Sequence, residues 1–313
     1  MGKKLISIII LILALGTLVF ILTTRNSKPA EKAGSHKITV VTTLFPLYDF
    51  AKNIGKTRVE VSLLLPPGVE AHSFEPKPSD LVKVNEADVF IYTGKFMEPW
   101  AEDIIKSVTN KNLIIVDASQ GTKMIPGVFH DADEPTGSLD PHIWLDLDNA
   151  KIMVSNILHA LETKDPANRD NYKQNSDDYC KKLTDLDSSF KTALADCKGK
   201  EIVYGGHYAF GYLAHRYALK YLAAQGFSPD AEPTARDLAM LVEQIRKDNI
   251  KYVFYEELTS PKIAETIANE TNTKLLLLNA AHNVTKNQFV QGTSFLDIMK
   301  SNLDNLKVGL GCP

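Results

Sequence analysis

The chain has 313 residues, of which 44% are hydrophobic and 23% are charged, a balance that is typical of globular proteins and excludes a disordered chain. Its formal net charge of −3 gives no electrostatic basis for binding nucleic acid. Its three cysteines are too few for a disulfide-rich scaffold or for a metal cluster held by thiolates.

The N-terminus has the pattern of an export signal. Lys3 and Lys4 precede an apolar run over 5–22, whose length is at the border between a signal sequence and a membrane-spanning helix. No cysteine follows the run to carry a lipid, and no clear cleavage site is present. We therefore expect an uncleaved membrane anchor over 1–24, with signal cleavage as the alternative. Residues 25–36 would then form a flexible tether, with the body of the protein outside the cytoplasmic membrane.

From residue 37 onward, short apolar runs rich in β-branched residues alternate with helical patterns. The runs predict strands at Lys37–Thr43, Val59–Leu65, Val89–Thr93, Leu113–Asp117, Glu201–Tyr204, Lys220–Ala223, Tyr252–Tyr255 and Lys274–Leu278. Helices are expected at Leu44–Asn53, Ser79–Glu86, Glu98–Val108, Tyr208–Tyr217, Arg236–Asn249, Pro261–Asn269 and Ser294–Leu306. Wholly apolar strands separated by helices imply parallel sheets covered on both faces. The sequence thus predicts an α/β protein with two four-stranded lobes, at 37–165 and 197–313.

Residues 150–195 are almost entirely helical in pattern. Asp165-Pro166 should interrupt them, leaving a first helix near Ala150–Thr163 and a longer one near Ala167–Ala195. At about 1.5 Å per residue, the second would be roughly 43 Å long. We expect 166–196 to connect the lobes rigidly, although the pattern equally fits a surface helix of one lobe.

Three cysteines could form at most one disulfide. Cys180 and Cys197 lie on or just beyond the long helix, too far apart to be joined. If a disulfide forms, we expect it between Cys197 and Cys312.

Four histidines stand near the ends of predicted elements. His72 follows the second strand, His207 the fifth and His282 the eighth, whereas His142 precedes the first connecting helix. Ligands of open α/β sheets bind at the carboxyl ends of the strands, and imidazole suits zinc, copper and nickel. One such histidine is more often an ordinary loop residue. Four of them, shared between two lobes, predict a metal ion in the cleft between the lobes.

The other candidate residues have simpler explanations. His130 lies in an acidic loop that could hold metal weakly, and ordinary surface positions explain His36, His159 and His215. Glu256 and Glu257 could form a catalytic acid/base pair, but adjacent residues of a strand point to opposite faces, which favours a supporting role. The chain contains no metalloprotease, phosphate-binding-loop or nucleophile-elbow motif. We expect no enzymatic activity.

Five motifs, in order along the chain, resemble those of the zinc- and manganese-binding solute-binding proteins of bacterial ABC transporters. They are VTTLFP at 41–46, LLPPG through HSFEPKPSD at 64–80, DPHIWLD at 140–146, GHYAFGY at 206–212 and LNAAH at 278–282. The resemblance covers about 38–308. It implies two α/β lobes joined by a long rigid helix, with one metal ion in the cleft.

The resemblance also implies the ligands. Three family positions fall on His72, His142 and His207, and the fourth, usually a carboxylate, falls on His282. Four imidazoles disfavour manganese and favour zinc, but they leave the charge of the ion to other groups. The candidates to orient the rings or balance this charge are Glu70, Glu75, Asp140 and Glu256. The loop over 127–138 is much poorer in histidine than in many zinc-type relatives, which argues against a metal-collecting role.

The function implied is that of an extracytoplasmic receptor, which we expect to be a monomer, that captures one Zn²⁺ and delivers it to a membrane ABC permease and its ATPase. The leading rival is a surface zinc hydrolase with three histidine ligands and Glu256 or Glu257 as base. Four protein ligands argue against it, because they leave no position for a reactive water. The sequence also fits a manganese or iron receptor of the same family, or an adhesin whose metal is only structural.

Overall fold

The computed structural model describes Gly2 and residues 37–127, 139–227, 229 and 232–313. The tether over 25–36, most of the loop over 127–138, His36, His130 and, apart from Gly2, the expected anchor over 1–24 therefore lie outside the described residues. Within the described part of the chain, no helix is both long enough and apolar enough to cross a membrane.

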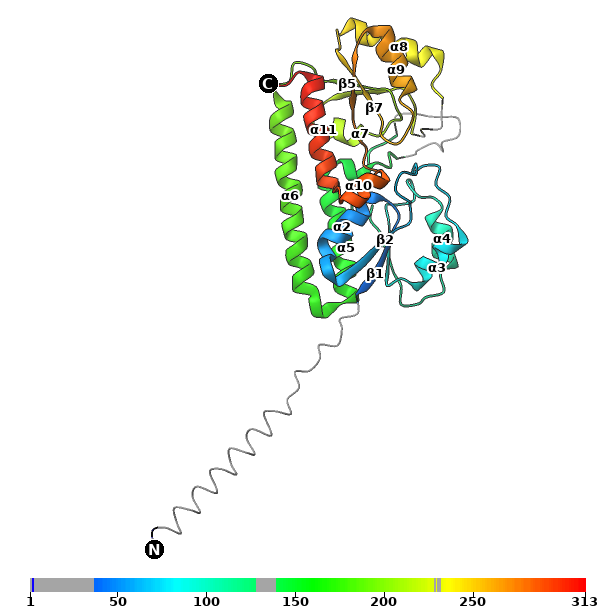
Figure 1. The fold of residues 1–313 in the computed structure, drawn as a ribbon, viewed down its shortest axis with the longest axis vertical. Coiled ribbons are helices and arrows are strands. Elements are labelled where there is room, and N and C mark those ends of the chain that lie inside the picture. The colour runs from blue at the N-terminus through cyan, green and yellow to red at the C-terminus, as the bar shows by residue number, and fades with distance from the viewer. Residues whose placement is uncertain (1, 3–36, 128–138, 228, 230–231) are drawn as a thin grey trace. The chain divides into compact units, whose positions relative to one another are not determined.

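The described residues form two four-stranded sheets, and every strand pair in them is parallel (Figure 1). The strands are β1 Ile38–Thr42, β2 Val59–Leu63, β3 Val89–Tyr92, β4 Ile114–Asp117, β5 Glu201–Tyr204, β6 Lys220–Ala223, β7 Tyr252–Tyr255 and β8 Lys274–Leu277. Their order is β2-β1-β3-β4 in the first lobe and β6-β5-β7-β8 in the second, so the two lobes share one topology. The prediction of two four-stranded α/β lobes is confirmed.

Helices cover both faces of each sheet. They are α2 Phe45–Gly55, α3 Pro78–Glu86, α4 Ala101–Ser107, α5 Leu147–Lys164, α6 Arg169–Ala195, α7 Gly211–Arg216, α8 Ala235–Lys247, α9 Lys262–Thr271, α10 Lys286–Gln291 and α11 Phe295–Leu310, with short 3₁₀ turns at Lys56–Arg58, Ile143–Leu145 and Pro166–Asn168. Neighbouring strand residues enter different cores: Val40 packs in the main core, and Val41 packs with Phe90 beneath α3 and α4. This two-sided burial explains why the inner strand β3 (VFIY) is apolar throughout, whereas the edge strand β2 (VEVSL) carries the exposed Glu60.

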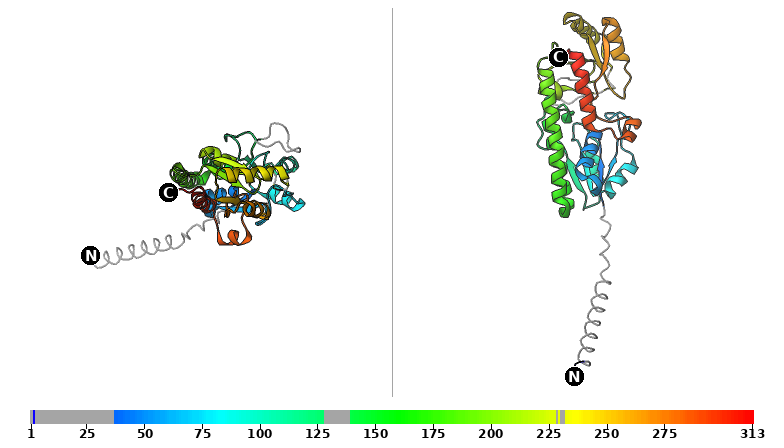
Figure 2. Two further views of the ribbon diagram at one scale, coloured as in Figure 1. Left: turned by 90° about the horizontal axis from the view of Figure 1, so that it is seen from above. Right: turned by 60° about the vertical axis from the view of Figure 1, so that its left-hand side comes forward.

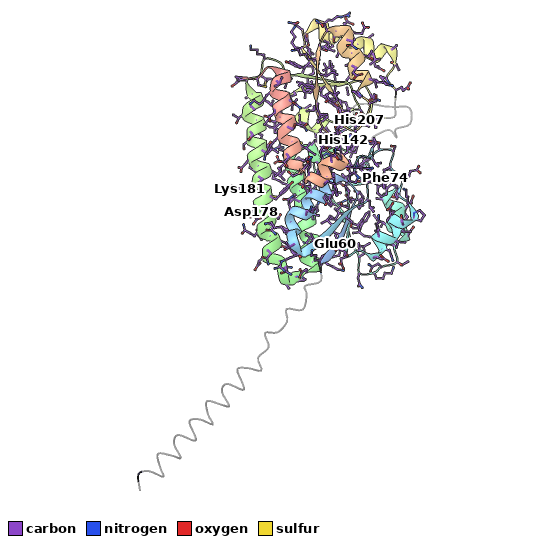
Figure 3. All side chains as sticks on the ribbon, viewed as in Figure 1. Glu60, Phe74, His142, Asp178, Lys181 and His207 are labelled. Carbon is purple, nitrogen blue, oxygen red and sulfur yellow. A yellow bond between two sulfur atoms is a disulfide. The ribbon has the colours of Figure 1, made fainter. Side chains whose placement is uncertain are left out.

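The helix α6 runs beside both lobes (Figures 1 and 2). Tyr179 of α6 donates a 2.8 Å hydrogen bond to Asp49 on α2, in the first lobe. Further along α6, Asp187 accepts two bonds from Arg216 on α7, in the second lobe. Its opposite face, which carries Asp178 and Lys181, is exposed (Figure 3). The helix therefore connects the lobes as expected, while the exact lobe boundaries at 165 and 196 stay predictions.

The structure bears on several local predictions. The disulfide joins Cys197 to Cys312, as expected, and Cys180 is free and half-buried. Thr234 caps α8 by accepting a hydrogen bond from the backbone of Asp237. The helix α9 begins one residue later than expected, at Lys262, with Pro261 immediately before it. The six-residue helix α10 was not predicted.

Candidate metal centre

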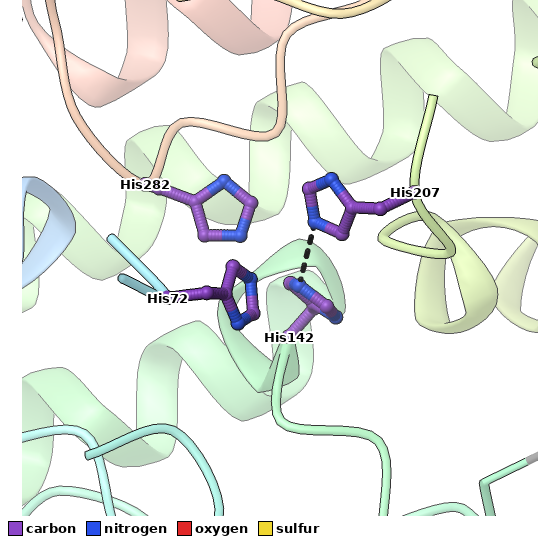
Figure 4. Close-up of side chains that lie close together, drawn as sticks. All are labelled: His72, His142, His207 and His282. Carbon is purple, nitrogen blue, oxygen red and sulfur yellow. Dashed lines mark hydrogen bonds between the residues drawn. The ribbon is translucent and has the colours of Figure 1, made fainter. Parts of the chain in front are cut away.

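The four predicted histidines lie together between the two lobes (Figure 4). One nitrogen of each ring lies within 4.8 Å of a nitrogen of every other. All the ring-centroid distances among them fall between 4.9 and 5.4 Å, close to the equal spacing of a tetrahedron. Among the described residues, no other group of three or more His, Cys, Asp or Glu side chains could hold a metal ion.

Four separate loops carry these rings. His72 follows β2, His207 follows β5 and His282 follows β8, all at the carboxyl ends of strands, whereas His142 immediately precedes the 3₁₀ turn at Ile143–Leu145. His142 and His207 are fully buried and His282 is nearly so, while His72 is half-buried. Figure 3 shows His142 and His207 where the two lobes meet. The remaining described histidines, His159 and His215, are exposed on helices, as expected.

One pair of ring nitrogens has the separation that zinc requires. The Nε2 atoms of His142 and His207 are 3.3 Å apart. Zinc–nitrogen bonds of about 2.0–2.1 Å at tetrahedral angles place two ligand atoms about 3.3–3.4 Å apart. These two rings therefore stand at the spacing of one edge of a zinc tetrahedron.

The other two rings have nitrogens directed into the protein interior. Nε2 of His72 and Nε2 of His282 are buried, and neither has a hydrogen-bond partner among the described residues. A buried polar atom without a partner is costly, so it normally has a function that explains it. A cation bound by both nitrogens supplies that explanation, and all four rings would then bind it through Nε2.

Three carboxylates stand behind three of the rings. Asp140 Oδ1 lies 2.8 Å from Nδ1 of His142, and Glu256 Oε1 lies 2.7 Å from Nδ1 of His207. Glu257 Oε1 is farther, 3.8 Å from Nδ1 of His282. A carboxylate at Nδ1 keeps the proton there and leaves the lone pair of Nε2 for a metal. These three negative charges would also balance the positive charge of a bound cation, which four neutral imidazoles do not neutralise.

The candidate carboxylates have different roles. Asp140 and Glu256 orient rings, as expected. Glu70 instead holds the loop backbone, because it accepts hydrogen bonds from the amides of His72 and Ser73. Glu75 is exposed. Glu257, for which a supporting role was expected but no particular ring was named, faces His282.

Glu256 also explains a glycine in the sequence. A Cβ atom at Gly206 would lie 2.5 Å from Oε2 of Glu256, closer than atoms can approach. The same Oε2 accepts a 3.2 Å hydrogen bond from the backbone of His207. Glycine at 206 therefore lets the carboxylate reach both the backbone and the ring of His207.

Aromatic rings complete the surroundings. Trp144 donates a 2.7 Å hydrogen bond from Nε1 to the carbonyl of Ala280, and its ring centroid is 5.3 Å from that of His282. Phe227 is stacked at 6.4 Å from His142. The position of Trp144, two residues after His142, is the only signal in the sequence that could have identified it.

The environment sets the protonation of the rings. Burial, reinforced by the neighbouring imidazoles, holds the pKa of His72 and His142 well below its usual value, so both are neutral and able to bind a cation. Burial also acts to lower the pKa of His207, but the carboxylate of Glu256 outweighs it, and the pKa is raised. A cation must therefore displace a proton more often from His207 than from His72 or His142.

Comparison with known proteins agrees with this geometry. Residues 40–309 match the family described as zinc-uptake complex component A, periplasmic. The chain is 36% identical to the high-affinity zinc uptake system protein ZnuA of Bacillus subtilis, over 91% of each chain.

Streptococcal proteins are also similar. The zinc-binding protein AdcA of Streptococcus pyogenes is 35% identical over 87% of this chain, which spans only 56% of that longer relative. The Zn(II)-bound ZnuA-like domain of Streptococcus pneumoniae AdcA has the same fold, with a TM-score of 0.75 and 32% identity, over 88% of this chain and 99% of that one. The chain belongs to the family of periplasmic zinc-uptake components, the zinc-type members of the metal-binding solute-binding proteins of ABC transporters.

Proposed function

We propose that this chain captures one Zn²⁺ ion on the Nε2 atoms of His72, His142, His207 and His282, outside the cytoplasmic membrane, and delivers it to an ABC permease driven by its ATPase. The observation that carries the proposal is the convergence of four imidazoles, three of them buried and one half-buried, with one pair at the 3.3 Å spacing of an edge of a zinc tetrahedron. The zinc-bound streptococcal domain of the same fold supports zinc as the cargo.

The donor set favours zinc over manganese. Manganese prefers carboxylate, carbonyl and water oxygens, whereas imidazole nitrogens suit zinc. The carboxylates at this site contact the rings through Nδ1, which places them behind the ligands. The resulting site offers four nitrogen ligands, and carboxylates that do not bind the ion themselves balance its charge.

The complete set of four protein ligands argues against a hydrolase. A catalytic zinc keeps one position open for water, but four protein donors fill a tetrahedral site. Glu256, the base of the rival mechanism, is 2.7 Å from the ring of His207 and so is engaged in orienting a ligand. We therefore propose transport without catalysis. Action as a monomer and membrane association through residues 1–24 are further parts of the proposal.

Competitive titration against a chromophoric zinc chelator tests the ligand set. Apparent zinc-binding free energies of about 10–16 kcal/mol, shared by four ligands, are about 2.5–4 kcal/mol each, so each His→Ala change should weaken binding by about 100- to 1,000-fold. His159→Ala and His215→Ala remove exposed histidines and should leave the affinity unchanged. Unchanged affinity in His282→Ala would show that the fourth ligand is misassigned, and preference for Mn²⁺ over Zn²⁺ would overturn the choice of cargo.

A further inference from the structure

The loop that carries His72 is fastened to the loop that carries His282. Between Leu64 and Lys77 the chain forms neither helix nor strand. Asn283, which is fully buried, donates two hydrogen bonds from Nδ2 into this loop, at 2.7 Å to the carbonyl of Pro66 and 2.9 Å to that of Val69. The amide of Gly68 donates a third, at 2.8 Å, to the carbonyl of Val284. These hydrogen bonds join residues more than 200 positions apart in the chain.

The segment that contains Asn283 is itself held in place. The carbonyl of His282 accepts a 3.1 Å hydrogen bond from the amide of Phe45, at the start of α2. Asn302 on α11 bonds both the amide and the carbonyl of Asn279, at 2.9 and 2.7 Å. The side chain of Asn283 is oriented by its own Oδ1, which accepts the amide of Val284 at 2.9 Å. Because helices fix this segment, it serves as the support and the His72 loop as the supported part.

The loop of His72 has few anchors near the ring. Glu70 bonds the amides of His72 and Ser73, but Glu70 belongs to the same loop and cannot fix its position in the molecule. The hydrogen bonds of Asn283 and Val284 do reach outside the loop. Zinc affinity depends on ligands that are already in place, and loss of a supporting hydrogen bond typically weakens metal binding by about 10- to 100-fold.

We propose that Asn283 is a positioning residue for zinc capture: it holds His72, a ligand from the first half of the chain, in register with His282 from the second half. This inference rests on the proposed function, because it takes His72 as a zinc ligand. His72 and His282 then act as one prearranged pair, although their strands belong to different sheets.

A double-mutant cycle tests this role. Asn283→Ala should weaken zinc binding by about tenfold, and by the same factor in a His142→Ala background. In a His72→Ala background it should have no further effect, because the ligand that it positions is gone. Asn283→Asp keeps the size of the side chain but cannot donate to the two carbonyls, so it should behave like the alanine variant.

The chain offers a closely matched control. Asn110 also donates from Nδ2 to two backbone carbonyls, those of Asn85 and Ala87, at 3.0 and 3.1 Å, and its Oδ1 accepts the amide of Asn112. It lies in the first lobe between α4 and β4, so Asn110→Ala should leave zinc affinity unchanged. In the zinc-free protein, amide hydrogen exchange at Gly68 should accelerate in Asn283→Ala and stay the same in Asn110→Ala.

Different failures have different meanings. If His72→Ala itself leaves zinc affinity intact, the ligand set of the proposed function fails. If His72→Ala weakens binding but Asn283→Ala adds its full effect to it, or has none, only the positioning role is overturned. Equal losses in Asn283→Ala and Asn110→Ala would also overturn it.

Discussion

Exchanging Glu256 for glutamine should weaken zinc binding by about 10- to 100-fold while the protein stays folded. Glu256 Oε1 is 2.7 Å from Nδ1 of His207, and its other oxygen accepts the amide of the same residue. Glutamine keeps the shape of the side chain but removes the negative charge that fixes the ring and balances the ion. Groups in this position are worth about 10- to 100-fold in metal affinity, or about 1.4–2.7 kcal/mol.

The loss should depend on pH with a defined sign. Although burial acts to lower the pKa of His207, Glu256 raises it above its usual value, so in the natural protein a proton competes with zinc at this ring. Without the carboxylate, the pKa of His207 falls and the competition weakens. As the pH falls through the raised pKa of His207, the natural protein therefore loses part of its higher zinc affinity. The gap in zinc affinity between the natural protein and Glu256→Gln should be widest at pH 7.5 and narrower at pH 5.5.

Competitive titration with a zinc chelator at both pH values measures the gap. Glu201→Gln is a matched control, because it removes one half-buried carboxylate from the opposite end of the same sheet, where Glu201 pairs with Lys220. It should alter zinc affinity by less than about twofold, since Glu201 begins β5 and contacts none of the four histidines. The reasoning is refuted if the two glutamine variants lose equal affinity, or if the gap for Glu256→Gln widens as the pH falls.

Three further results are expected. First, the logarithm of zinc affinity should fall with decreasing pH with a slope below four, where four would mean that zinc displaces one proton from each ring. The slope is lower because the pKa of His72 and of His142 is held well below its usual value. A slope of four in chelator titrations from pH 5.5 to 7.5 would contradict this. Second, burial raises the pKa of Asp49 from 3.8 to about 6, so the natural protein loses unfolding free energy as the pH rises through that range. Asp49→Asn does not titrate there, so its stability relative to the natural protein should rise by up to about 3 kcal/mol between pH 4 and 7, measured by urea unfolding of zinc-free samples. Third, replacing both Cys197 and Cys312 by serine opens a link across 115 residues and should cost about 2–5 kcal/mol; a urea midpoint unchanged from that of the oxidised protein would contradict it.

The periodicity of the sequence predicted most of the fold. Each of the eight strands lies within two residues of its expected bounds, because each contains a short run rich in apolar and β-branched residues that ends at polar or turn-forming residues. The helix α10 was not predicted because its six residues are too few to establish a helical period. Its start could have been recognised from Thr285 and Gln288, which form a capping box three residues apart.

The grouping of the four histidines could be predicted from the sequence, but their supporting residues only partly. Three of the histidines follow strands whose carboxyl ends face the cleft, so their position along the chain carries the information. Contacts such as that of Asn283 with Pro66 join loops of opposite lobes, and no local pattern encodes them. Supporting residues of this kind can be identified only when the two lobes are seen together.

Glu257 shows how a correct rule led to an incomplete result. Adjacent residues of a strand do point in opposite directions, which argued against Glu256 and Glu257 acting as a pair. Both residues, however, lie just beyond the end of β7, and the sheet order places β7 between β5 and β8. Glu256 therefore reaches His207, in the loop after β5, while Glu257 faces His282 at 3.8 Å and accepts the amide of Ala280, in the loop after β8. Their divergence lets one strand end supply a carboxylate to each neighbouring histidine loop, so the arrangement that argues against a catalytic pair provides two separate supports for a metal site.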